Sequence, residues 1–125
     1  MKTRNHALSA LLGVALALPM SVQAIEDTDT LYVFCRATDI DSGRVFYSDV
    51  FPVQRRRYYD NDTTFTIAFS NHVDARWDTR TGHPSRRSCW HEEQALDAWM
   101  ERDRHAAEQR RAIRSFEPVF IHWRP

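Results

Sequence analysis

A histidine and a carboxylate on two predicted helices are the first residues of this chain that could do chemistry. His72 and Asp103 each lie among apolar residues at helical spacing, one on each helix. A buried carboxylate needs a partner, and a His–Asp pair supplies the base and its orienting group in many hydrolases. Because no Ser or Cys nucleophile has a recognisable context such as a GxSxG elbow, we interpret the two residues as a structural ion pair, or Asp103 as the partner of an Arg. A small envelope hydrolase using His72 and Asp103 remains an alternative.

An acidic face of the second helix has a spacing that could bring ligands around a cation. Asp97, Glu101, His105 and Glu108 follow one another at intervals of three or four residues. The sequence after His91 has the first half of an HExxH motif and lacks the second His. We therefore interpret these residues as a solvated helix face, and expect no metal and no other cofactor.

A basic and aromatic segment, Arg55-Arg56-Arg57-Tyr58-Tyr59, has the composition of a single-strand nucleic-acid binder, and Arg86-Arg87 adds to it. The overall charge argues against that function, because the chain has 17 basic and 17 acidic residues. Without Lys2 and Arg4 the net charge is about −2. We expect no nucleic-acid partner, and interpret the segment as a loop that contacts acidic groups of this chain or of a protein partner.

The first 24 residues predict export. Lys2 and Arg4 precede an apolar run over 7–18, and Val22-Gln23-Ala24 has the small, uncharged ends that a signal peptidase requires. The run is about half of the roughly 20 residues that a membrane-spanning helix needs. We predict a signal peptide over 1–24 and a single mature domain over 25–125. This domain would lie in the periplasm or be secreted, without a membrane span after cleavage.

The two cysteines, Cys35 and Cys89, both lie in the predicted mature domain. In an oxidising compartment two cysteines most simply form one disulfide. No CxxC motif occurs in the chain, so the predicted bridge is structural rather than catalytic.

The elements that must position these residues follow the order β-β-α-α-β. Strands are predicted over 31–37 and 44–51, joined by a turn at 39–43, and a last strand over 119–123 follows Pro118 at a sheet edge. Helices are predicted from Asp62 or Thr63 to about Trp77 and from about Glu92 to Arg111, with loops over 54–62 and 78–88. This order predicts an α+β domain: a three-stranded antiparallel sheet with two helices packed on one face and one disulfide.

Side-chain alternation predicts which face of the sheet the helices cover. Leu31, Val33 and Cys35 share one face of the first strand, and a bridge to Cys89, just before the second helix, turns that face toward the helices. Large aromatic residues then lie on the opposite, open face: Tyr32, Phe34 and, from the last strand, Phe120 or Trp123. The second helix is expected to pack on the sheet through Leu96, Trp99, Met100, Ala106 and Ala107.

Four short segments together resemble small exported, single-disulfide domains of Gram-negative bacteria without assigned activity. They are Tyr32-Val33-Phe34-Cys35, the run over 45–51, Cys89, and the run over 119–123. The resemblance covers about a third of the mature chain. It implies export, one disulfide and an α+β domain, and it transfers no catalytic residues.

These features favour a protein that acts by binding another protein. The most concrete expectation is an inhibitor or immunity-type protein against a toxin or hydrolase in the cell envelope. Beside the hydrolase, the other alternative is an accessory module that binds cell wall or an extracellular polymer. The predicted partner-binding residues are aromatic and Arg residues, the types enriched in interface hot spots: Tyr32, Phe34, Phe120, Trp123, Arg55, Arg56, Arg57, Tyr58 and Tyr59.

Overall fold

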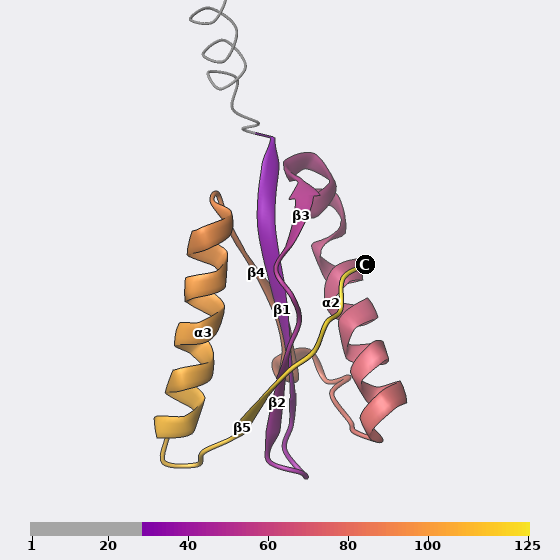
Figure 1. Cartoon of the computed structure of the whole chain (residues 1–125). Helices are drawn as coiled ribbons and strands as arrows, with labels where there is room; N and C mark the ends of the chain where they lie inside the picture. The colour runs from indigo at the N-terminus through magenta and orange to yellow at the C-terminus, as the bar shows by residue number, and fades with distance from the viewer. Residues whose placement is uncertain (1–28) are drawn as a thin grey trace, which may run out of the picture.

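The computed structural model describes residues 29–125, so the predicted signal peptide lies outside the described residues. Five strands form one sheet: β1 (Thr30–Asp39), β2 (Arg44–Tyr47), β3 (Phe51–Gln54), β4 (Arg87–Glu92) and β5 (Glu117–Phe120). Two helices, α2 (Arg55–Trp77) and α3 (Ala95–Arg111), flank the sheet, and a 3-10 turn, η1 (Pro84–Arg86), precedes β4 (Figure 1).

Strand β1 is the centre of the sheet. Strand β4 pairs with it along one edge, while β2 and β3 pair with successive parts of the other edge, all three antiparallel. Strand β5 extends the sheet beyond β2 and runs parallel to it. The α+β class is therefore confirmed. The sheet, however, has five strands in a mixed arrangement rather than three antiparallel ones.

Two strands arise from segments predicted otherwise. The predicted strand over 44–51 is interrupted at Ser48. The N–H of Ser48 donates to the carbonyl of Cys35 at 3.0 Å, and the hydroxyl of Ser48 accepts a hydrogen bond from the N–H of Cys35 at 2.8 Å. The chain resumes pairing as β3, and Arg55 then begins α2, within a predicted loop. Helix α2 is kinked at Asn61, directly before the predicted start. Strand β4 begins in another predicted loop, over 78–88, and continues to Glu92, the predicted start of the second helix. It was not predicted because its residues, half-buried at a sheet edge, lack a run of apolar side chains.

Both faces of β1 are buried, and each face packs against a different helix. Leu31, Val33 and Cys35 contact α2 in one core cluster, as the alternation predicts. Phe34 belongs to a second cluster on the other face, with Ala98 and Ala106 of α3. The helices therefore cover opposite faces (Figure 1), and the predicted one-sided packing is wrong. The physical reason is that a strand with an uninterrupted apolar run is covered on both faces.

The disulfide joins Cys35 of β1 to Cys89 of β4, which are directly opposite in the strand pairing, so the predicted bridge is confirmed. Their Cα atoms are 4.0 Å apart. The bridge lies on the α2 side of the sheet, where Thr66 donates a hydrogen bond to the Cys89 sulfur at 3.3 Å. It ties the edge strand β4 to the centre of the sheet.

Candidate functional site

The predicted open aromatic face does not exist, because α3 covers it. Phe34 is completely buried, stacked on Trp90 at 5.5 Å between ring centroids and edge-on to His105 at 5.7 Å. Tyr32 is half-buried on the same side of the sheet. Trp123 lies half-buried on the opposite side, against Phe69 at 5.2 Å. Phe120 alone of the four predicted aromatic residues is exposed, at 45%.

The basic and aromatic segment 55–59 is the first part of α2 rather than a loop. Arg55 pairs with Glu93 at 3.0 Å, and Arg57 lies over the ring of Phe65. Tyr58 is buried, with its ring 4.9 Å from that of His91 on β4. Arg56 and Tyr59 are exposed. The segment therefore packs mainly against its own chain.

His72 and Asp103 do not meet, because they lie on helices that cover opposite faces of the sheet. The His72 ring lies 6.3 Å from the rings of Trp77 and Trp123, and burial lowers its pKa. Asp103 is exposed and pairs with Arg102 at 3.2 Å. The pairing of His72 with Asp103 is therefore wrong, whereas the predicted alternative, Asp103 as the partner of an Arg, is confirmed. The geometric basis of a hydrolase that uses His72 and Asp103 together is lost.

Two carboxylates of the acidic face form ion pairs with Arg104. They belong to Glu101 and Glu108, and Glu101 also lies 3.2 Å from Nε2 of His105. The hydrogen bonds from Arg104 are the main cause that lowers the pKa of Glu101. Within residues 29–125, no group of three His, Cys, Asp or Glu side chains could hold a metal ion. The face is a solvated ion-pair network.

Helix α3 packs on the sheet through a stripe that shares Ala106 with the predicted one but not its large apolar residues. Ala98 and Ala106 are its fully buried residues. Leu96 and Met100 are 69% and 60% exposed, and Trp99 is 36% exposed. Small residues let the helix approach closely, and the rings of Phe34 and Trp90 fill the space beneath it. The larger apolar side chains consequently point away from the core.

Of these side chains, Trp99 lies next to Phe120 of β5, with Arg102 between the two rings. We define the α3–β5 surface as Leu96, Trp99, Arg102, Met100 and Phe120. The guanidinium carbon of Arg102 lies 4.5 Å from the ring centroids of both Trp99 and Phe120, so the cation joins the two rings. Arg102 also donates to the carbonyl of Ser48 at 3.1 Å and to the carboxylate of Asp103.

The α3–β5 surface has the composition of a protein-binding site. Leu96, Trp99 and Met100 are neighbours on the helix surface because they are three and four residues apart. Aromatic residues, Met and Arg are the types enriched in protein interfaces. Arg102 is held on both sides, and its side chain is only 12% exposed, so the rings beside it are ordered before any partner binds. The surface contains no pair of nucleophile and base.

Sequence reasoning identified Phe120 but missed the other residues of this surface. The spacing of Leu96, Trp99 and Met100 predicts a core-facing stripe. The competing signal was Ala98, which together with Ala106 of the predicted stripe marks a narrower face that suits close packing on the sheet. Which stripe faces inward depends on the space left above Phe34 and Trp90, and that space is a tertiary property.

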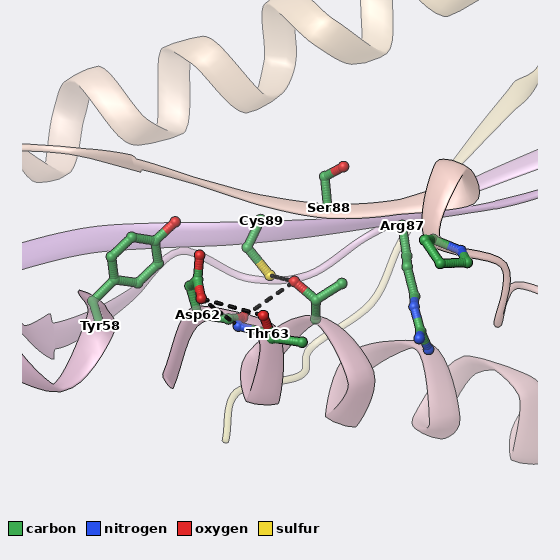
Figure 2. Close-up of a pocket in the computed structure, with 8 residues that line it drawn as sticks. Tyr58, Asp62, Thr63, Arg87, Ser88 and Cys89 are labelled. Carbon is green, nitrogen blue, oxygen red and sulfur yellow. Dashed lines mark hydrogen bonds between the residues drawn. The ribbon is translucent and has the colours of Figure 1, made fainter. Parts of the chain in front are cut away.

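A groove of about 320 Å³ lies between α2 and β4, alongside the disulfide (Figure 2). In it Asp62 accepts a hydrogen bond from the N–H of Thr63 at 2.7 Å, and Thr66 contacts the Cys89 sulfur. Its lining contains a carboxylate and a guanidinium but no imidazole or free thiol: Tyr58, Asp62, Thr63, Thr66, Pro84, Arg87, Ser88 and Cys89.

Comparison with known proteins gives no functional assignment, so the function is inferred from the fold and from the α3–β5 surface. No protein family model matches the chain, and no curated protein or solved structure matches it either. None of the helices in the described part of the chain is long and apolar enough to cross a membrane.

Tyr47 of β2 packs against Phe120 on the neighbouring strand and gives a first testable prediction. The two rings stack at 5.7 Å, and the Tyr47 hydroxyl is buried without a hydrogen-bond partner among the described residues. A buried polar group without a partner costs about 1–3 kcal/mol. We therefore expect Tyr47→Phe to raise the free energy of unfolding by about 1 kcal/mol in urea denaturation at neutral pH. A loss of stability would show that the hydroxyl has a bound partner.

The same residue predicts a dependence of stability on pH. Burial raises the pKa of Tyr47 from 10.0 to about 12. The unfolded chain therefore ionises first, so the contribution of Tyr47 is complete below pH 10 and declines as the pH rises toward 12. Urea denaturation across this interval should show a steeper decline for the wild type than for Tyr47→Phe. Equal slopes would contradict the assignment.

Proposed function

We propose that this protein binds another protein outside the cytoplasm through the α3–β5 surface. The observation that carries the proposal is the exposed apolar group of Leu96, Trp99 and Met100 on α3, which Arg102 joins to Phe120 on β5 through the ring of Trp99. Exposure of large apolar side chains in one place has a solvation cost, which binding to a partner removes. The most concrete role is that of an inhibitor or immunity-type protein against an envelope-acting toxin or hydrolase.

The compartment is part of the proposal. The Cys35–Cys89 disulfide fits an oxidising compartment, since disulfides persist outside the cytosol. The charged start and apolar run of residues 1–24 fit a cleaved signal peptide and delivery to the periplasm or the medium. The resemblance to small exported Gram-negative domains supports the same compartment.

A rigid scaffold favours inhibition over catalysis. The rings of the surface are attached to a helix and a strand, and the sheet beneath them is cross-linked by the disulfide. A preordered surface loses little conformational entropy when it binds, and tight protein inhibitors exploit this. The two residues that the sequence suggested as acid and base, His72 and Asp103, are separated by the sheet.

The proposal predicts a specific loss of binding on Trp99→Ala. If Trp99 is a hot spot, its removal should weaken partner affinity by about 2 kcal/mol, which is roughly thirtyfold. The partner is first captured from envelope and secreted fractions, and its affinity is then measured by titration calorimetry. Thermal unfolding of the variant should stay close to that of the wild type, because the side chain lies at the surface.

The matched control is Ile67→Ala, which removes an apolar side chain of similar exposure, 38%, from α2. We expect it to leave partner affinity unchanged. Equal affinity of Trp99→Ala and wild type would contradict the assignment of the surface. Binding of purified cell-wall polymer, lost on Trp99→Ala with no protein captured, would instead support the accessory-module alternative.

A further inference from the structure

Two of the three outer edges of the sheet are blocked by proline. The N–H groups of Glu117 and Ile121 donate to carbonyls on the β2 side. Because successive N–H groups of a strand point to opposite edges, the nitrogen of Pro118 points away from the sheet. The N–H of Arg55 donates to Asp29 on the β1 side, which in the same way turns the nitrogen of Pro52 outward on β3. Proline at such positions prevents another strand from adding to an edge.

Strand β4 forms the third edge and carries no proline. Cys35 directs its N–H and its carbonyl toward Ser48, away from β4, so Cys35 and Cys89 are a non-hydrogen-bonded pair. Their Cα separation of 4.0 Å agrees with this geometry. The backbone groups of Cys89 and His91 therefore point out of the sheet, and no hydrogen bond within residues 29–125 satisfies them.

Charge is distributed along this edge so that it complements itself. Arg86 and Arg87 lie at its beginning, and Glu92 and Glu93 lie at its end. In antiparallel pairing with an identical strand, each basic end lies next to an acidic end. In parallel pairing like charges would be adjacent. Among the described residues neither Arg87 nor Glu92 has an ion-pair partner of its own.

We propose that two copies of this protein associate through antiparallel β4–β4 pairing about a twofold axis at Cys89. The backbone N–H of each Cys89 then donates to the Cys89 carbonyl of the second copy. The N–H of each His91 donates to the Arg87 carbonyl of the second copy. The same patch serves on both subunits, as a closed symmetric dimer requires. The two sheets become one continuous sheet.

The helices lie over the two faces of β4, so an added strand would approach from its outer edge. Figure 2 shows β4 between α3 on one side and α2 on the other, with Ser88 pointing to the α3 side and Arg87 and Cys89 to the α2 side. The groove beside the disulfide accompanies the strand on the α2 side. Pairing leaves Phe120 of the α3–β5 surface away from the new interface, because β5 lies on the other side of β1 from β4.

Sedimentation equilibrium of the disulfide-bonded protein over a wide concentration range tests the dimer. We expect a monomer–dimer equilibrium for the wild type and a monomer at every concentration for His91→Pro. That substitution removes an outward N–H and no hydrogen bond to β1. His91→Ala is the matched control, since it removes the ring and keeps the N–H, and it should still dimerise. A monomeric wild type, or a dimer that persists in His91→Pro, would overturn the proposal.

Charge variants test the antiparallel register without a proline. Reversing the basic end, Arg86→Glu with Arg87→Glu, and reversing the acidic end, Glu92→Arg with Glu93→Arg, should each weaken dimerisation at least about tenfold. Combining all four substitutions restores opposite charges across the axis and should bring the dissociation constant back toward that of the wild type. Near-UV circular dichroism verifies folding of each variant. Failure of the combined variant to recover, although folded, would contradict antiparallel pairing.

Discussion

Replacing both cysteines by serine should lower the free energy of unfolding by about 4 kcal/mol. The bridge closes a loop with a sequence separation of 54 residues, and the conformational entropy that the unfolded chain gains when this loop is open gives this magnitude. A domain of this size has a total stability of about 5–15 kcal/mol, so the loss is a large fraction of it. Urea denaturation of the wild type and of Cys35→Ser/Cys89→Ser measures the difference.

Reduction provides the internal control for this experiment. Dithiothreitol should lower the stability of the wild type to that of the double variant and leave the variant unchanged. Substituting both cysteines together avoids a free thiol that could form disulfides between molecules. Two free thiols in the unreduced, unfolded wild type would refute the bridge itself. An unchanged urea midpoint in the double variant would show that β4 stays paired with β1 without it.

The second large effect is expected at Phe34. Its ring is completely buried between β1 and α3, against Trp90 and His105. Phe34→Ala removes these contacts and leaves a cavity that the two elements cannot close, so we expect a loss of about 3–5 kcal/mol. Thermal and urea denaturation of the variant measure it.

Phe120→Ala is the matched control, because it removes the same side chain from a position that is 45% exposed. It should cost far less stability and should weaken partner binding. The two variants thus separate the residue that supports the α3–β5 surface from one that belongs to it. Equal loss of stability in both would mean that Phe120 is a core residue, and the proposed surface would lose one of its aromatic members.

Much of this arrangement could be predicted from local pattern. The alternation along β1 correctly placed Leu31, Val33 and Cys35 on one face, and the two cysteines predicted their own bridge. The breaker residues and helical spacing located both helices to within a few residues over most of their length, although α2 begins earlier than predicted. The strand faces and the helices depend on residues close in sequence, and two cysteines can form only one intramolecular disulfide.

The candidate site could not be predicted in the same way. Phe34 alternates with Leu31 and Val33 just as an exposed residue would, and only the position of α3 buries it. Leu96, Trp99 and Met100 form a stripe that is as apolar as a core stripe, yet Ala98 and Ala106 face the sheet instead. A helix with two usable faces chooses between them according to the shape of the surface on which it packs.

The sequence by itself therefore determined the fold class, the disulfide and one face of the central strand. Tertiary structure decided that the helices lie on opposite faces, that β4 is a strand at an open edge, and that Arg102 joins Trp99 to Phe120. The reason is physical. Periodicity records which side chains share a face of one element, whereas burial depends on which elements meet, and that depends on contacts between residues far apart in the chain.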